Sequence, residues 1–404
     1  MPTLFISLFL FLLPTQLGKH FFLDFSYING VRVDYNTIVL YTTDILVLIL
    51  AVLYRKQILS SLQKNAKRWL ILTLLFSANV LLSQFPQLAL YQGFKLFEVY
   101  LVFLIFNNAR LSNKILLGSL AVGALLQLTL ALAQFQLARS LQGVFYYFGE
   151  RLLSLSTPGV AKASIAGREI LRPYGTFSHP NSMGGFYALV YAFTLFTGLP
   201  SIKHVRFEIV RIIKPALLLI SSMLVLLSFS KVAIITYIII TALYVYLQKD
   251  NTKCTLCKAA KIIVPATISL VFLQAMGDPF SLAIRGELLL QSLGIVWQNL
   301  FFGTGLGHYL FYQASLPSQF ARFALQPVHN IYLLFLAQTG VILGGAVAYI
   351  VYKYLWMMRK NRRFIAIILV ILITGSLDHY WLTLQQNMLL LGVVFGITSS
   401  LQSQ

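Results

Sequence analysis

Long apolar runs recur along the whole chain and restrict its fold more than any other feature. Stretches such as residues 234–247 and 365–373 contain no charged side chain. With 58% hydrophobic residues and a mean hydropathy of +0.79, a water-soluble protein of 404 residues could not bury this much apolar surface. Only helices and closed barrels can span a bilayer, because each backbone polar group must be paired within the protein. Barrel strands would appear as short alternating segments, so the unbroken runs predict transmembrane helices.

The apolar runs predict an all-α, polytopic integral membrane protein with about twelve transmembrane helices, since one span needs roughly 17 to 25 residues. We interpret residues 1–404 as a single transmembrane domain. The first run lacks the basic start and the cleavage site of a signal peptide, so it is interpreted as a short span. The predicted spans lie near residues 3–18, 37–54, 69–85, 88–106, 115–138, 182–199, 214–229, 232–248, 261–276, 329–352, 364–377 and 381–399.

The basic residues predict the orientation of these spans. Twenty of the 31 Lys and Arg residues fall in alternate, mostly short loops. The positive-inside rule makes those loops cytoplasmic, together with both termini. A first long loop, residues 139–180, and a second, residues 277–328 between spans 9 and 10, then face outward. Because the net charge of +20 is spread over these loops, the pattern does not favour a nucleic-acid partner.

The second outer loop, residues 277–328, is expected to be partly helical. Apolar residues recur at helical spacing between residues 285 and 300. Glycines at 303, 305 and 307 end this helix, and a second short helix is expected over residues 317–325. The glycine pattern is not a nucleotide-binding fingerprint, because no strand–helix unit surrounds it.

Three ionisable residues lie inside predicted spans, where charge is costly. Lys95 and Glu98 share one face of the fourth span, and Asp44 lies in the second. A structural pair that ties helices together is favoured over a proton or ion pathway, because no chain of further carboxylates crosses the membrane. Cys254 and Cys257 form at most half of a four-ligand zinc site, so they do not predict a metal.

Polar side chains concentrate at the predicted outer rim. Arg172 to Asn181 close the first outer loop, Lys231 lies in an outer turn, and Asp378 to Trp381 lie between the last two spans. Each has a structural explanation when taken alone: Lys231 could be an interfacial anchor and Trp381 part of the aromatic belt. Together with Arg285 and His329 they place cations, imidazoles and amides on one side of the bilayer.

These motifs, taken in order, resemble the O-antigen ligase and O-antigen polymerase superfamily. The resemblance extends over about residues 140 to 390, and the N-terminal part fits in topology alone. Family members usually carry arginine where this chain has Lys231. The motifs that carry the resemblance are Arg172-x-Tyr-Gly-Thr-Phe-x-His-Pro-Asn181, Leu227-Ser-Phe-Ser-Lys231, Arg285 with Trp297, Phe302-Gly-Thr-Gly-Leu-Gly307, Pro327-Val-His-Asn-Ile-Tyr-Leu333 with Gly340, and Asp378-His379-Tyr380.

The resemblance implies transfer of a glycan from undecaprenyl diphosphate to a glycan or lipid acceptor at the outer face of a bacterial inner membrane. It implies no cofactor, no nucleotide sugar and no metal. Carried over by position, Arg285 and Lys231 would contact the diphosphate, and His329 would be catalytic. Lysine offers a point charge where arginine can hold a phosphate with two hydrogen bonds, so Lys231 would make a weaker contact.

The residue types support this chemistry independently. A glycosyl diphosphate is already activated, so its departure needs cations aimed at the developing charge. Arg285, Lys231 and Arg172 have the required charge. Histidine titrates near pH 6.5, so His329 can take the proton of an acceptor hydroxyl. We expect direct displacement with inversion at the anomeric carbon.

The expected site therefore has two catalytic residues, His329 and Arg285, and a larger binding set. Asp378 and Glu287 are alternative bases that rank behind His329. The remaining residues are expected to bind the diphosphate or the glycan, and they are Lys231, Arg172, Asn330, His179, Asn181, Asp378 and His379.

Two alternatives stay open at this point. The motifs do not separate a ligase from a polymerase that extends the glycan on its carrier. A flippase or transporter of lipid-linked glycans belongs to a different class, for which charged central pathways and inverted repeats are typical. The chain shows no repeat, and its polar residues lie at the rim, which favours the transferase.

Overall fold

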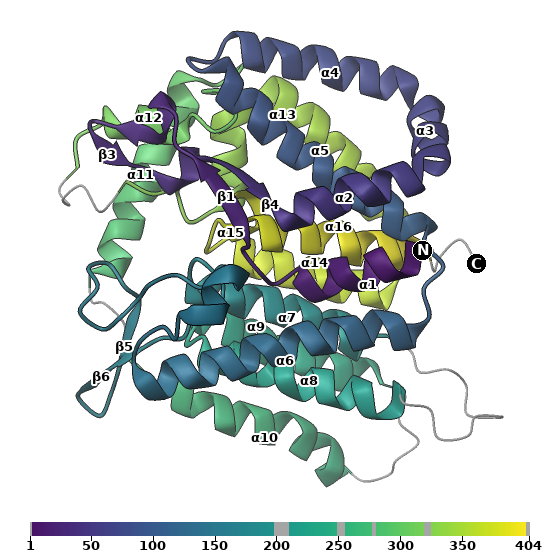
Figure 1. Cartoon of the computed structure of the whole chain (residues 1–404), viewed down its shortest axis with the longest axis vertical. Coiled ribbons are helices and arrows are strands. Elements are labelled where there is room, and N and C mark those ends of the chain that lie inside the picture. Colours follow the sequence, from purple (N-terminus) through teal and green to yellow (C-terminus); the bar gives the residue numbers. More distant parts are fainter. Residues whose placement is uncertain (1, 198–209, 249–254, 277–279, 319–324, 401–404) are drawn as a thin grey trace. The chain divides into compact units, whose positions relative to one another are not determined.

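A computed structural model describes residues 2–197, 210–248, 255–276, 280–318 and 325–400 (Figure 1). These residues are mostly helical, as expected. Their contacts group the chain into two compact units, each made of several segments. Unit 1 is Met1–Leu17, Arg110–Pro279 and Asn361–Thr374, and unit 2 is Gly18–Ala109, Phe280–Lys360 and Gly375–Gln404.

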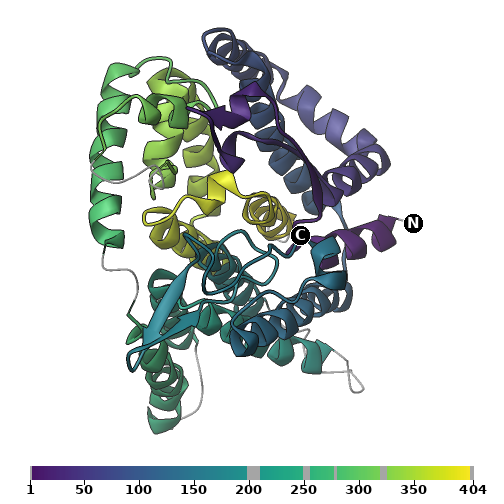
Figure 2. The same ribbon diagram turned by 60° about the vertical axis from the view of Figure 1, so that its left-hand side comes forward.

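Unit 1 is a helix bundle with a small strand pair. Helix α6 packs against α1 and α8, and α7 packs against α8 and α9 (Figures 1 and 2). The N-terminal end of α6 is capped by the Ser112 hydroxyl, which accepts a hydrogen bond from the Ile115 amide. Its elements are α1 (Pro2–Leu12), α6 (Asn113–Leu137), η3 (Gly143–Phe148), β5 (Lys162–Ile165), β6 (Arg168–Leu171), α7 (Pro180–Leu195), α8 (Val210–Leu227), α9 (Lys231–Leu247), α10 (Thr255–Leu273) and α14 (Arg362–Gly375).

Unit 2 is built around the pair α5 and α16, with α2 and α4 also against α5. Its N-terminal part is a short strand segment, and its later part holds α11 to α13. The elements are β1 (Gly18–Phe21), η1 (Asp24–Ser26), β2 (Tyr27–Ile28), β3 (Val31–Arg32), η2 (Asp34–Asn36), β4 (Ile38–Tyr41), α2 (Thr42–Leu53), α3 (Arg55–Lys64), α4 (Ala66–Leu81), α5 (Pro86–Asn108), α11 (Ser281–Gln298), α12 (Tyr309–Ala314), α13 (Ile331–Met358), α15 (Tyr380–Thr383) and α16 (Gln385–Ser400).

Short antiparallel strand pairs modify the all-α expectation. β1 pairs with β4, β2 with β3, and β5 with β6. The β2–β3 turn is Asn29-Gly30, and both residues have positive φ. That sequence is a strong hairpin signal, because this turn follows the natural twist of the strands. Ala166-Gly167 makes the same turn between β5 and β6.

Each predicted apolar run contains a helix, but the count of about twelve spans is not confirmed. Four described helices are long and apolar enough to cross a membrane, namely α5, α6, α8 and α13. The pair α2 and α3, bent by 80°, would make a fifth. Some runs are interrupted, which leaves shorter helices. β4 takes up the start of the run at 37–54, and α15 is separated from α16 in the run at 381–399.

The glycine turn of the second outer loop packs against a break in α13. Gly340 has φ 62° within α13, and a Cβ there would lie 2.3 Å from the Phe301 carbonyl oxygen. The Thr304 and Gly305 amides donate to the Ala337 and Gln338 carbonyls, at 2.8 and 3.1 Å. Close backbone approach therefore requires glycine at position 340 and explains the glycine-rich turn.

Two further side chains hold this turn within unit 2. Asn79 of α4 donates to the Phe302 and Gln338 carbonyls and accepts from the Leu306 amide. The Nε2 atom of His308 accepts from the Phe85 amide at 2.9 Å, so its Nδ1–H donates to the Leu306 carbonyl. Burial lowers the pKa of the His308 imidazole, which keeps it in this neutral form.

The helix predicted over residues 285–300 is found as α11. Most of the short helix expected over residues 317–325, and Cys254 of the cysteine pair, lie outside the described residues. The boundaries assigned to the two outer loops and to a single membrane domain stay predictions.

Candidate active site

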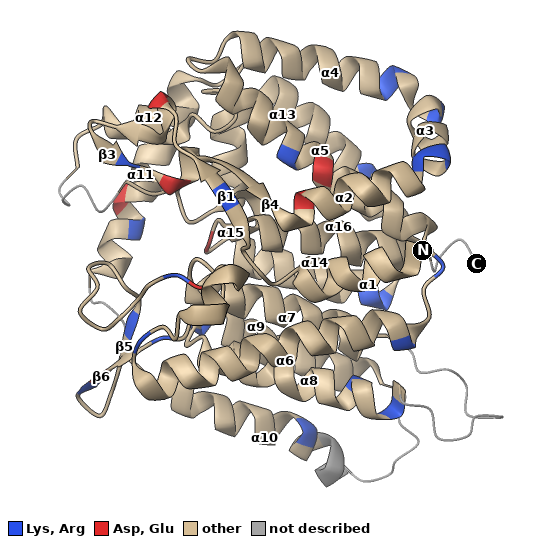
Figure 3. Cartoon of the chain, viewed as in Figure 1, with Lys and Arg blue, Asp and Glu red and all other residues tan. Residues whose placement is uncertain are grey.

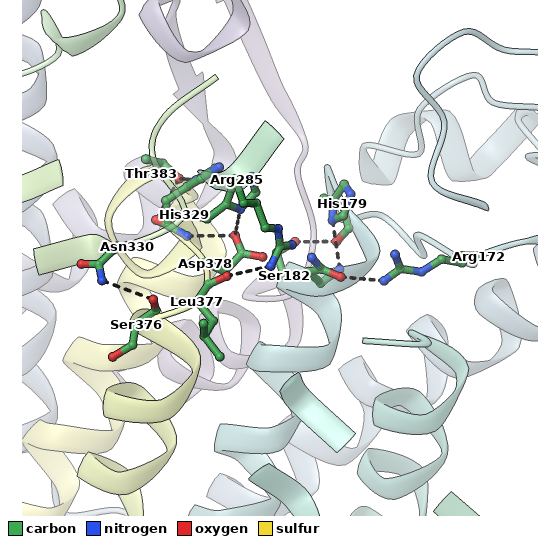
Figure 4. A network of polar contacts seen from close by, with 12 residues as sticks. Arg172, His179, Ser182, Arg285, His329, Asn330, Ser376, Leu377, Asp378 and Thr383 are labelled. Atoms are coloured by element: carbon green, nitrogen blue, oxygen red, sulfur yellow. Dashed lines mark hydrogen bonds and ion pairs between the residues drawn. The ribbon is translucent and has the colours of Figure 1, made fainter. Parts of the chain in front are cut away.

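A corner of unit 2, formed by residues 376–379 just before α15, brings together several of the predicted site residues. Asp378 and His379 lie in this corner, and both are buried. His329 precedes α13, and its Nδ1 atom lies 3.5 Å from the Asp378 Oδ1 atom (Figure 4). This Nδ1 atom is buried and has no hydrogen-bond partner among the described residues. The imidazole and the carboxylate therefore face each other at a distance slightly longer than an ordinary hydrogen bond.

Asn330 and Arg285 bind the backbone of the same corner. The Asn330 side-chain oxygen caps α13 by accepting from the Tyr332 and Leu333 amides, both at 3.0 Å. Its Nδ2 atom donates to the Ser376 carbonyl at 3.2 Å. The guanidinium of Arg285, from α11, donates to the Leu377 carbonyl at 3.3 Å (Figure 4). Asn330 thus fixes the chain that carries His329, and Arg285 places a cation beside Asp378.

His379 is a second imidazole in the same corner. Its ring lies 5.1 Å from the His329 ring, and its Nδ1 atom lies 2.8 Å from the Thr383 hydroxyl. The edge of the Tyr35 ring packs against it at 5.4 Å. Burial lowers the pKa of His379 to about 4, and its neighbour Asp378 opposes this shift. His379 is therefore neutral near pH 7.

His329, Asp378 and His379 also form a candidate metal-ligand group. One ligand atom from each lies within 4.8 Å of the others. Two histidines and one carboxylate are a common ligand set for transition metals. The positive charge of Arg285 argues against a bound metal cation here. This charge acts on His379 and helps to lower its pKa, so it would also repel a cation. The expectation of no metal therefore needs a direct test.

In unit 1, the predicted residues Arg172, His179 and Asn181 are brought together by one network. The Arg172 Nε and Nη2 atoms donate to the Ser228 carbonyl at 3.0 and 2.9 Å, and Nη2 donates to Asn181 Oδ1 at 2.6 Å. Figure 4 shows the Arg172 and His179 side chains of this network. The His179 Nδ1 atom accepts from the Asn181 amide and caps α7. These contacts tie the start of α7 to the turn before α9.

Two glutamines of α6, not anticipated from the sequence, hold the same motif from inside unit 1. The Gln134 side-chain oxygen accepts from the Tyr174 and Gly175 amides at 2.9 and 2.8 Å. The Gln127 side-chain oxygen accepts from the Thr176 amide at 2.9 Å. Both glutamines are almost fully buried. Their seven-residue spacing on one face of an apolar helix was the signal that could have found them.

Lys231 begins α9 and has a different environment. It follows the turn in which Phe229 has φ 50° and the Ser230 amide donates to the Ser228 hydroxyl. Its side chain is exposed, and the described residues give it no hydrogen bond or ion pair. Of the two predicted cations in unit 1, Arg172 is held by hydrogen bonds within the protein, whereas the Lys231 ammonium is exposed.

Tyr35 and Thr383, which contact His379, are further site residues that sequence reasoning missed. Thr383 follows His379 by one helical turn, and its hydroxyl also lies 3.1 Å from the His379 carbonyl oxygen. That spacing is a readable signal. Tyr35 comes from the N-terminal strand segment, where no pattern in the sequence points to the corner.

A comparison with protein families finds one match in the central part of the chain. Residues 216–347 match the family model described as O-Antigen ligase. The matched segment contains Lys231, Arg285 and His329, and it ends before Asp378. A search of the curated proteins finds no match. The chain is helical and has several apolar helices, as a multi-pass membrane protein does. Residues 216–347, with the motifs around them, are thus similar to the O-antigen ligase and polymerase superfamily.

Proposed function

We propose that this protein is a glycosyltransferase that moves a glycan from undecaprenyl diphosphate to an acceptor glycan or lipid. The transfer takes place at the outer face of a bacterial inner membrane, with both termini in the cytoplasm. The family match over residues 216–347 supports ligase- or polymerase-type activity in general. The observation that carries the finer proposal is the corner in which His329 faces Asp378 and Arg285 binds the adjacent Leu377 carbonyl.

The proton transfer rests on the His329–Asp378 pair. With Nδ1 directed at the carboxylate, Nε2 is the nitrogen that can take a proton from the acceptor hydroxyl. The hydroxyl oxygen forms a bond to the anomeric carbon, and the bond from that carbon to the diphosphate oxygen breaks. Asp378 stabilises the imidazolium that forms. The 3.5 Å separation is expected to shorten when substrate binds, as catalytic hydrogen bonds often do.

The departing diphosphate needs positive charge. Arg285 supplies it beside the His329–Asp378 pair, and its partner there is a carbonyl rather than a carboxylate. A guanidinium held in this way retains its full charge for an incoming anion. Lys231 is a second candidate diphosphate ligand because its ammonium is exposed. We also propose that Arg172, His179 and Asn181 bind the donor. The hydrogen-bond network that they form would hold their side chains in position.

The proposal is tested with the full-length protein in proteoliposomes that contain a defined undecaprenyl-diphosphate-linked oligosaccharide. Bond formation to an added acceptor supports a ligase, and longer glycans on the carrier support a polymerase. Nuclear magnetic resonance of the product reports the anomeric configuration, for which inversion is expected. A covalent glycosyl-enzyme intermediate would contradict direct displacement.

Two results would overturn the proposal. Leaflet exchange of the labelled donor without any new glycosidic bond would make the protein a flippase. Near-normal transfer by both His329→Gln and Arg285→Ala would remove the assigned site. The exposed His20 of β1 offers a matched control, because His20→Gln changes an imidazole outside this corner.

A further inference from the structure

Unit 2 contains a buried charge cluster that the proposed transfer does not use. Lys95 and Glu98 lie in the middle of α5, and Asp44 lies in the first turn of α2. Figure 3 shows red acidic segments on α2 and α5, two helices that contain no other acidic residue. Asp44 and Glu98 are 8% and 9% exposed. In a membrane helix bundle, such groups must be neutralised by one another or by a ligand.

The distances separate the two carboxylates. The Lys95 Nζ atom lies 2.6 Å from Asp44 Oδ2 but 3.5 Å from Glu98 Oε2. The Tyr41 amide also donates to Asp44 Oδ2, at 2.9 Å. Asp44 therefore has a close cation and a backbone donor, which are the partners an ionised carboxylate needs. If Glu98 were ionised as well, two carboxylates would share a single lysine.

Gln385, at the start of α16, bridges the two carboxyl groups. Its Nε2 atom donates to Asp44 Oδ1 at 2.6 Å and to Glu98 Oε2 at 3.1 Å. Both carboxyl groups therefore face the same two side chains, the Gln385 amide and the Lys95 ammonium. Two ionised carboxylates beside a single cation would repel each other, and one proton on either of them removes this repulsion.

The other oxygen of Glu98 indicates which group carries the proton. Glu98 Oε1 is buried and has no hydrogen-bond partner among the described residues. A bare carboxylate oxygen is costly at such a depth, whereas the carbonyl oxygen of a neutral acid costs far less. The charged groups that act on Glu98 are Lys95 and Asp44.

We propose that Asp44, Lys95, Glu98 and Gln385 form a proton-binding site, in which Glu98 is a neutral carboxylic acid and Asp44 is the anion that pairs with Lys95. The proton brings the net charge of the cluster to zero. It thereby keeps the first turns of α2 and α16 on the middle of α5. A metal cation fits less well, because the Lys95 ammonium and the Gln385 amide direct donors into the cluster where a cation needs several oxygens.

Infrared spectroscopy of the full-length protein in lipid nanodiscs tests this site. The wild type at neutral pH should show the C=O band of a protonated carboxylic acid, with a shift in D2O. Glu98→Gln should abolish this band. Glu150→Gln is the matched control and should leave the band unchanged, because buried Glu150 lies outside this cluster and its two oxygens accept hydrogen bonds from the Leu141 and Gln142 amides and from Gln134.

Asp44→Asn is the second variant, and it keeps Glu98 in place. Lys95 then has Glu98 as its one acidic partner, so Glu98 should ionise and the band should again disappear. Raising the pH should lower the thermal unfolding midpoint of the wild type, since the native state loses a bound proton, and Glu98→Gln should flatten this dependence.

A band that persists in Glu98→Gln, or its absence from the wild type, would overturn the proposal. The same conclusion would follow if sodium ions raised the unfolding midpoint of the wild type but not of Glu98→Gln. The cluster would then be a cation site rather than a proton site.

Discussion

The Arg172–Asn181 stretch of unit 1 and the corner around Asp378 in unit 2 contain similar side chains in different states. In the first, the Nε and Nη2 atoms of Arg172 and the amides around His179 are paired within the protein. In the second, His329 Nδ1 faces a carboxylate without a completed hydrogen bond. Residue type and motif therefore do not distinguish a structural hydrogen-bond network from a candidate active site. What distinguishes the two regions is how completely their polar atoms are paired within the protein.

The largest effect is expected from His329→Gln and Arg285→Ala. Loss of a general base costs about 10²- to 10⁴-fold in rate, and loss of the cation removes stabilisation of the leaving group. The initial rate of glycan transfer measures both. The thermal unfolding midpoint should stay close to that of the wild type, because neither side chain is fully buried. If either variant lost transfer because it unfolded, its side chain would be structural. The proposed difference between the two regions would then not hold.

Asp378→Asn should be the next most severe. The amide is isosteric but cannot stabilise an imidazolium, so transfer should fall by roughly 10² or more. Asp34→Asn is the matched control, because Asp34 is exposed and pairs with Arg32 on the surface. Equal transfer rates for Asp378→Asn and the wild type would show that His329 works without this partner.

Arg172→Ala should act mainly on stability. The substitution leaves the Ser228 carbonyl and the Asn181 side chain without their donor, which costs about 1–3 kcal/mol. Chemical denaturation measures this loss, and Arg172→Lys should recover part of it. Transfer per folded molecule should fall less than for Arg285→Ala. If transfer vanished while stability was unchanged, Arg172 would bind the donor by direct contact and would not be needed to hold the Ser228 and Asn181 network together.

Acid should destabilise unit 2 through His379. The folded-state pKa is lowered to about 4 from the ordinary value near 6.5. The neutral ring's contribution is therefore complete above pH 6.5 and is lost as the pH falls toward 4, by at most roughly 3 kcal/mol. Unfolding midpoints between pH 7 and pH 4 should show this loss, and His379→Gln should reduce it. A loss of the same size in His379→Gln would assign the effect elsewhere, for example to His308.

Removal of divalent metal ions should have the smallest effect. Because Arg285 already places a cation beside the corner, a strong chelator is expected to leave the transfer rate unchanged. A decrease that an added divalent ion reverses would make His329, Asp378 and His379 metal ligands. That result would change the proposed chemistry of unit 2 and leave unit 1 as it is.

Much of the fold could be predicted from local patterns. The apolar runs locate the helices because side-chain burial in lipid depends on hydrophobicity along the chain. The Asn29-Gly30 turn is also a local signal, because this residue pair favours a two-residue hairpin turn. The number of spans was less predictable. An apolar run is compatible with a strand start, as in β4, or with a helix break, as at Gly340.

The sequence by itself determined the helical membrane class, the resemblance to the O-antigen ligase and polymerase superfamily, and the residue types of the candidate site. The tertiary structure alone decided which of those residues face one another. Asn79 reaches Gln338, and Gln385 reaches Asp44, across more than 250 positions of the chain. Such hydrogen bonds depend on how helices pack, and no local propensity encodes them. The same packing places the His329 Nδ1 atom 3.5 Å from the Asp378 carboxylate in unit 2. In unit 1 it gives the Asn181 side chain a hydrogen bond from Arg172.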